Sequence, residues 1–142
     1  MTGSHTIGMA RCVSFKQRLY NQHRDNQPAK TLERMFYSTL ASTCPRNGGD
    51  NNLRPLEFAT PSKFDNTYYK LLIEGRGLLN SDEVLWTGRD PQIAGLVRSY
   101  AENEPLFFEH YVNSITKMGN INPLTGYDGE IRKNCRVVNK KI

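Results

Sequence analysis

Histidines and cysteines are the residues of this 142-residue sequence with the clearest potential for chemistry. His5 stands among small and hydroxyl residues in MTGSHTIGMARC and leads into a segment that carries Cys12. Histidines at chain starts are commonly solvated and without a role. This stretch alone leaves two interpretations open: His5 is incidental, or the sequence begins in the middle of a functional site.

The cysteine count is odd. Cys12, Cys44 and Cys135 contain no CxxC pair, which argues against a zinc cluster. One disulfide and one cysteine with a missing partner would account for three thiols.

Composition indicates a single domain with a mild positive charge. Lys and Arg number 19 against 14 Asp and Glu, a net charge of +5. The basic residues are scattered, and the locally basic tail from Arg132 to Lys141 lacks clustered aromatics, so we expect no nucleic-acid partner. No apolar run is long enough to span a membrane, and no signal peptide is recognisable, so the chain taken literally would stay in the cytosol. Binding to acidic cell-wall polysaccharide rests on charge alone and is the weakest interpretation.

Helical periodicity dominates, and no strand pattern or repeat is visible, so we expect an all-α fold with helices joined by long ordered loops. The patterns predict helices over about 6–20, from Pro28 to Cys44, from Asp65 or Asn66 to Gly75, from Ser81 to Trp86, from Pro91 onwards, and from Glu104 to Gly119. Ile93, Leu96, Val97 and Tyr100 are expected to face inwards, as is an apolar stripe of the last helix that includes Val112 and Met118. Residues 45–66 form a proline-rich loop with many side-chain oxygens, and such long loops are usually functional or disordered.

Four segments in order, GSHTIGMARC, TPSKFDNTYY, GLLNSDEVLW and MGNINPLTGYDGEIRKNCRVVN, carry a family resemblance. Together they resemble the C-terminal half of a plant secretory (class III) haem peroxidase. The resemblance implies a two-domain helical fold with haem between the domains. Residues 1–142 would supply the proximal part, which binds haem and calcium, and the N-terminal distal half would be absent.

The resemblance implies that His5 is the axial ligand of the iron of haem b. Asp82 would accept a hydrogen bond from the other ring nitrogen and give the imidazole imidazolate character, which favours oxidised iron. Taken alone, Asp82 is more simply a first-turn carboxylate stabilised by the helix dipole.

The same resemblance implies a proximal calcium site. Its ligands would be Thr6, Glu57, Thr60, the backbone carbonyl of Lys63, and Asp65, all of them oxygen donors of the kind calcium takes. The family usually has an aspartate where this sequence has Glu57, so the extra methylene affects geometry and affinity. The plainer alternative is a solvated linker with incidental acids.

A disulfide between Cys12 and Cys44 also follows from the resemblance, and closing a loop of about thirty residues is worth about 3–4 kcal/mol. Cys135 would be unpaired because its family partner lies in the N-terminal half. His23 and His110 lack a metal-like spacing, so we expect the first to be solvated and the second to face solvent or a neighbour.

The family reaction is the oxidation of phenolic donors by hydrogen peroxide, with roles in peroxide removal, oxidative stress and cell-wall lignin metabolism. The resemblance also implies a secreted, extracellular or cell-wall location and a monomer. The family's distal histidine and arginine, which cleave peroxide, belong to a motif of the RxxFHDC kind that this sequence lacks. Two interpretations therefore compete: a fragment or truncated form of an enzyme, and a non-catalytic haem-binding or structural remnant.

Overall fold

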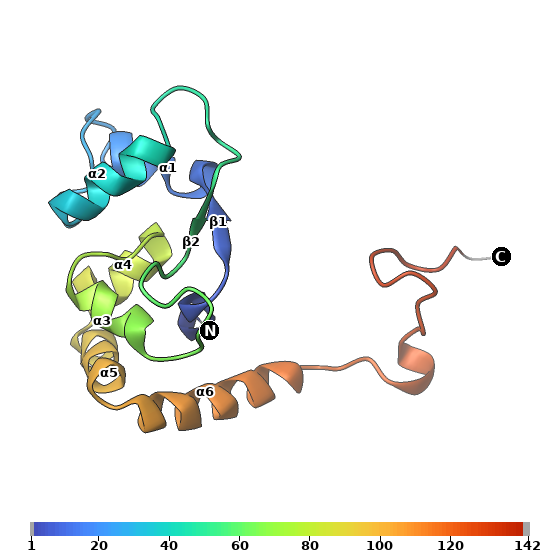
Figure 1. Ribbon diagram of the computed structural model, residues 1–142. Coiled ribbons are helices and arrows are strands. Elements are labelled where there is room, and N and C mark those ends of the chain that lie inside the picture. The colour runs from blue at the N-terminus through green and yellow to red at the C-terminus, as the bar shows by residue number, and fades with distance from the viewer. Residues whose placement is uncertain (1, 141–142) are drawn as a thin grey trace.

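The computed structural model describes residues 2–140 and is mainly helical, which confirms the all-α prediction (Figure 1). In chain order its elements are η1 (Thr2–Thr6), β1 (Met9–Arg11), η2 (Cys12–Ser14), α1 (Lys16–Tyr20), α2 (Arg34–Thr43), β2 (Leu53–Pro55), α3 (Thr67–Ile73), α4 (Asn80–Thr87), α5 (Pro91–Glu102), α6 (Glu104–Gly119) and η3 (Gly126–Asp128). Within this part of the chain, no helix combines the length and apolarity that a membrane span requires.

The helix predicted over residues 6–20 is wrong except at its end, where α1 forms. Gly8 has a φ of +112°, a conformation that L side chains rarely adopt, and it turns the chain out of η1. The following residues form β1, which pairs antiparallel with β2 and places Met9 opposite Pro55. Local periodicity missed this strand because its hydrogen-bonding partner lies far along the chain.

Helix α2 begins at Arg34 and not at Pro28. Glu33 caps it, since its carboxylate accepts hydrogen bonds from the backbone N–H groups of Met35 and Phe36 at 2.7 and 2.8 Å. The segment after Pro28 is held instead to α1, because Ala29 N–H donates to the carbonyl of Arg18. The predicted end is confirmed: α2 stops at Thr43, with Cys44 as its C-cap.

The starts of α5 and α6 follow from their caps. The Asp90 side chain accepts a hydrogen bond from Gln92 N–H, and α5 begins at Pro91 as predicted. The Asn103 side chain accepts a hydrogen bond from Leu106 N–H, so α6 begins directly after α5. Helix α4 begins at Asn80, one residue before the predicted cap at Ser81.

Two apolar clusters hold these elements. The first lies around α1, α2 and η2 and contains Cys12, Phe15, Leu19, Ala29, Leu32, Phe36, Leu40, Cys44 and Leu78. The second joins α3, α5 and α6 and contains Tyr68, Tyr69, Leu72, Val97, Ala101 and Phe107. Helix α6 runs along the base of the molecule, and the chain beyond it leads away from the helical body (Figure 1).

Several positions predicted to be internal are exposed. Ile93 and Leu96 are 40% and 45% exposed, and on α6 Val112 and Met118 are 58% and 44% exposed. Val97 and Phe107 are buried as expected. The periodicity identified the apolar faces of α5 and α6 correctly, but the described elements cover only part of each face.

Candidate functional site: a histidine–aspartate pair beside a buried oxygen cluster

A glycine lets η1 approach the aromatic cluster closely. A Cβ atom on Gly3 would lie 2.7 Å from the Tyr69 hydroxyl and 2.9 Å from the Phe107 ring, closer than side chains tolerate. Ser4 Oγ adds a hydrogen bond of 2.8 Å to the Tyr111 hydroxyl. The first turn of the chain is thereby held against α3 and α6, which brings His5 to α4.

His5 and Asp82 form the central pair. His5 Nδ1 lies 2.8 Å from Asp82 Oδ1, and Asp82 is fully buried. The Tyr68 hydroxyl donates to the same carboxylate oxygen at 3.1 Å, while Leu79 N–H donates to Oδ2 at 3.0 Å. The hydrogen bond to Asp82 raises the pKa of His5, against the opposing effect of partial burial.

Arg18 and Glu83, which sequence reasoning did not single out, hold the segment that carries Asp82. Arg18 Nη2 pairs with Glu83 Oε2, and Nη1 donates to the carbonyls of Gly77, Leu78 and Leu79. The Arg18 and Glu83 side chains are only 2% and 7% exposed. Burial lowers the pKa of Arg18, an effect that Glu83 opposes. Adjacent acids in the first turn of α4 are visible in the sequence, but no local signal pairs Glu83 with Arg18.

The pair has the chemistry of an oriented metal ligand. Within residues 2–140, His5 makes one side-chain hydrogen bond, through Nδ1, so Nε2 remains available for coordination. The His5 side chain is 27% exposed, which gives a bound group access to the ring. A histidine whose second nitrogen faces a carboxylate is a well-oriented donor for iron, so the residues present fit haem ligation.

The other histidines lie elsewhere. His23 is exposed in the connection between α1 and α2. His110 is half-buried on α6, and its Nδ1 lies 3.0 Å from the Tyr100 hydroxyl. Neither makes a hydrogen bond or a ring contact with His5 or Asp82 among the described residues.

A buried oxygen cluster, formed by Thr6, Glu57, Thr60 and Asp65, begins at the residue after His5. Thr6 Oγ1 donates to the Asp65 carbonyl at 2.9 Å. Thr60 Oγ1 lies 2.8 Å from Glu57 Oε2 and 3.1 Å from Asp65 Oδ2. Thr6, Glu57 and Asp65 are at most 2% exposed. The structure therefore gathers the four predicted side chains, which separate segments of the chain contribute.

The charge balance of the cluster favours a cation. Two buried carboxylates share one threonine hydroxyl, and the nearest basic group is the exposed Lys63, whose Nζ lies 3.6 Å from Asp65 Oδ2. Burial raises the pKa of Asp65, but hydrogen bonds from Thr67 and Thr60, together with Lys63, outweigh it and lower the pKa overall.

The donor set is one of hard oxygens. Among the described residues, no group of three or more His, Cys, Asp or Glu side chains is placed to hold a metal ion. The cluster contains two carboxylates, and its other oxygens come from hydroxyl and carbonyl groups. Calcium accepts such mixed oxygen ligands, so the residues present fit a calcium ion.

Glu57 is already engaged within its own turn. Its carboxylate accepts hydrogen bonds from the backbone N–H groups of Ala59 and Thr60. Lys63 N–H donates to the Thr60 carbonyl at 2.9 Å, which closes the turn that leads to Asp65. The longer side chain of glutamate thus reaches back to the loop backbone while one oxygen contacts Thr60.

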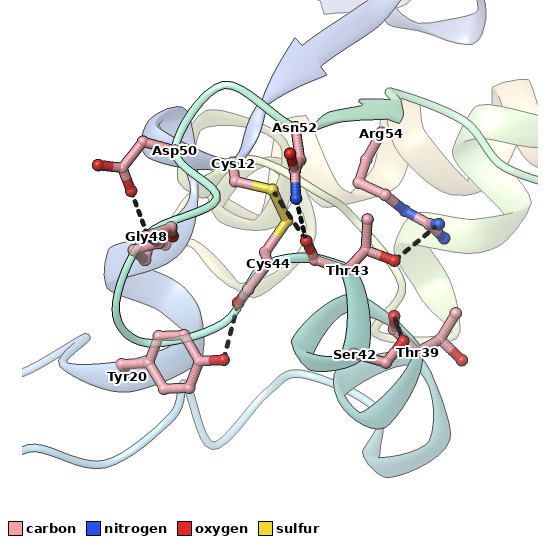
Figure 2. Close-up of a disulfide and its surroundings, with 11 residues drawn as sticks. Cys12, Tyr20, Thr39, Ser42, Thr43, Cys44, Gly48, Asp50, Asn52 and Arg54 are labelled. Carbon is pink, nitrogen blue, oxygen red and sulfur yellow. Dashed lines mark hydrogen bonds and ion pairs between the residues drawn. A yellow bond between two sulfur atoms is a disulfide. The ribbon is translucent and has the colours of Figure 1, made fainter.

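The disulfide between Cys12 and Cys44 is present and fully buried (Figure 2). It joins η2 to the end of α2, with the two Cα atoms 5.5 Å apart. Asn52 Nδ2 donates to the Thr43 carbonyl at 2.7 Å, and the Tyr20 hydroxyl donates to the Cys44 carbonyl at 2.8 Å (Figure 2). Cys135 is a free, exposed cysteine in the segment after α6.

Comparison with known proteins identifies a family. The family model described as peroxidase matches residues 1–103. Over 98% of the present chain, the sequence is 59% identical to Peroxidase 9 of Arabidopsis thaliana. Over the whole of the present chain, it is 52% identical to Peroxidase 36 of the same plant. It is 47% identical to Peroxidase RIP1 of Medicago truncatula over 97% of its length. These alignments cover 40%, 41% and 40% of the respective relatives.

The sequence similarity extends over nearly the whole chain. The chain belongs to the peroxidase family. The resemblance to plant peroxidases inferred from the four sequence segments is thereby confirmed, and the chain spans about 40% of the length of the curated relatives it matches.

Proposed function

We propose that residues 1–142 form the proximal part of a plant secretory haem peroxidase, with His5 as the axial ligand of the iron of haem b. The His5–Asp82 hydrogen bond carries this proposal. It orients an imidazole from a fully buried carboxylate and leaves Nε2 without a partner among the described residues.

When bound, the haem supplies a redox-active iron that reacts with hydrogen peroxide. The chain's own residues then have distinct tasks. His5 would hold the iron, and Asp82 would keep the imidazole proton on Nδ1. The Tyr68 hydroxyl donates a hydrogen bond to the same carboxylate oxygen. Arg18, paired with Glu83, holds the backbone segment that precedes Asp82.

The proposal includes a calcium ion at the oxygen cluster. Thr6, Glu57, Thr60, the carbonyl of Lys63, and Asp65 would hold it, and the two buried carboxylates provide the matching charge. Because Thr6 follows His5 in η1, the ion would also secure the turn that positions the iron ligand.

The reaction we propose is the oxidation of phenolic donors by hydrogen peroxide, with the family's roles in peroxide removal, oxidative stress and lignin metabolism. The buried disulfide is consistent with the secreted or cell-wall location of such an enzyme. We propose that the protein acts as a monomer.

A second candidate is a haem-binding or structural remnant without turnover. One observation favours it: among residues 2–140, neither His23 nor His110 makes a hydrogen bond or a ring contact with His5, so neither is paired with it for acid–base catalysis. The sequence also lacks a motif of the RxxFHDC kind.

Reconstitution with haem separates the two candidates. Turnover of a guaiacol-type donor above that of free haem, and lost in His5→Ala, supports the enzyme. A histidine-ligated haem spectrum that His5→Ala abolishes, with turnover no higher than that of free haem, supports the remnant. Haem binding unaffected by His5→Ala contradicts both.

A further inference from the structure

Beside the His5–Asp82 pair, three tyrosine rings connect the site to the side of α5 that faces α6. The ring centroids of His5 and Tyr68 are 6.2 Å apart in an edge-on arrangement. Tyr68 and Tyr69 are 5.0 Å apart, and Tyr69 and Tyr100 are again 5.0 Å apart. Each ring contacts the next, so electrons can tunnel between them over short gaps.

Tyr100, at the far end of this series, has a base for its proton. Its hydroxyl lies 3.0 Å from His110 Nδ1, and the two rings meet edge-on at 5.7 Å. Removing an electron from a phenol makes its proton strongly acidic, so a phenol bonded to an imidazole is oxidised more easily than one without a base. The Tyr68 hydroxyl donates its hydrogen bond to Asp82 instead, and the oxygens of this carboxylate also accept hydrogen bonds from His5 and from Leu79 N–H.

A cavity gives small molecules access to this pair. It has a volume of about 170 Å³ and lies between η1, α3, α4, α5 and α6. Tyr69, Tyr100 and His110 line it together with Leu96, Val97 and Phe107. An apolar cavity of this size with a polar edge suits a single phenolic ring.

We propose that Tyr100 is a second site of one-electron oxidation, linked to His5 through the rings of Tyr68 and Tyr69, at which phenolic donors in the cavity are oxidised. This inference rests on the proposed function, since hydrogen peroxide acting at the haem is the oxidant. Tyr100 gives up one electron along the ring series, and its O–H bond breaks as the proton moves to His110 Nδ1. The neutral tyrosyl radical then takes one electron from the phenolic donor, His110 returns the proton to Tyr100, and the donor releases its own phenolic proton to water.

The first test needs neither haem nor peroxide. A ruthenium polypyridyl photo-oxidant is coordinated to His5 of the haem-free chain in a His23→Gln background, and singly labelled protein is isolated. Flash oxidation should give a tyrosyl radical seen by transient absorption. We expect Tyr100→Phe and His110→Phe each to lower its yield several-fold. Tyr127→Phe, at a fully exposed position outside the cavity lining, is the control and should leave the yield unchanged. An unchanged yield in Tyr100→Phe, with native circular dichroism, overturns the proposal.

The second test uses the haem-loaded protein, rapidly frozen after addition of hydrogen peroxide. We expect an electron paramagnetic resonance signal of a tyrosyl radical that Tyr100→Phe removes, and a spin-trap adduct on Tyr100 in peptide mapping. An adduct confined to other tyrosines overturns the inference. Absence of any absorbance change with peroxide counts against the proposed function instead, and the photochemical result then decides the inference alone.

Discussion

His5 Nδ1 and Asp82 Oδ1 are 2.8 Å apart, and this contact joins η1 to α4 across 77 residues of sequence. The carboxylate is fully buried and accepts further hydrogen bonds from Tyr68 and from Leu79 N–H. An acceptor held by three donors is fixed in place, so it fixes the imidazole in turn.

We predict that His5→Ala abolishes histidine-ligated haem in the reconstituted protein, whereas His23→Ala at an exposed position leaves the spectrum unchanged. Asp82→Asn should keep the haem but lower the iron–histidine stretching frequency of the ferrous form in resonance Raman spectra. Loss of such an outer hydrogen-bond partner costs roughly 10–100-fold in affinity or activity. A stretching frequency equal to that of the wild type would show that Asp82 does not act on the ligand.

Calcium binding should depend on the oxygen cluster. In isothermal titration calorimetry we expect Asp65→Ala to abolish calcium binding and Glu57→Gln to weaken it, because each removes one of the two buried carboxylate charges. Asp25→Ala, which removes an exposed acid between α1 and α2, is the matched control. The assignment fails if Asp65→Ala binds calcium as the wild type does.

The buried Arg18–Glu83 pair should be more costly to break by one substitution than to replace by two. Arg18→Met or Glu83→Leu alone leaves a charge unpaired in the interior, which costs about 3–5 kcal/mol of unfolding free energy. The double variant should recover only part of this loss: it removes both charges, but the carbonyls of residues 77–79 lose the Arg18 donor. Urea unfolding measures both effects.

The comparison pair for that experiment is Lys16 and Asp50, whose aspartate is 58% exposed. Lys16→Met should change stability by about 1 kcal/mol or less. Additive losses in the Arg18/Glu83 double variant would mean that the two side chains act independently and that the pair does not stabilise the 77–79 segment.

Loss of the disulfide should destabilise the chain. The bond spans 32 residues of sequence, so replacing Cys12 and Cys44 with alanine should cost about 3–4 kcal/mol in the chain-entropy model. Thermal unfolding of the oxidised chain measures this effect. Cys135→Ser should leave the midpoint unchanged, because that cysteine is free and exposed.

Stability should fall at acidic pH partly through Glu33. Backbone hydrogen bonds from Met35 and Phe36 lower the pKa of this capping carboxylate below its unfolded value. Its contribution is therefore present above the unfolded pKa and is lost as pH falls through the folded pKa. Glu33→Gln should flatten the acid limb of a plot of urea midpoint against pH. A limb of unchanged slope would rule out a contribution from this cap.

Sequence reasoning succeeded where the determining interactions are local or where a whole motif is recognisable. Asp90 before Pro91 marks a helix start by itself, and Pro45 follows the end of α2. The family resemblance assigned Thr6, Glu57, Thr60 and Asp65 to one calcium site; the structure places these side chains in one cluster, and their role as calcium ligands stays a prediction.

It failed where distant parts of the chain decide the outcome. The strand at Met9–Arg11 depends on pairing with β2, and the turn that leads to it depends on the positive φ of Gly8. Arg18 reads as one of many scattered basic residues, and its burial against Glu83 appears only when α1 packs on the 77–79 segment. Periodicity identifies an apolar face, as at Ile93 and Leu96, but not what covers it.

His5 and Thr6 are consecutive residues of η1, so one peptide unit carries the proposed iron ligand and the first proposed calcium ligand. If either haem or calcium orders this turn on binding, the second ligand loses less conformational entropy when it binds. Thermodynamic linkage then requires reciprocity: whatever factor calcium contributes to haem affinity, haem contributes to calcium affinity. The two cofactors would act as cooperative ligands of a single short turn, and chelating the ion would loosen the haem without any direct contact between them.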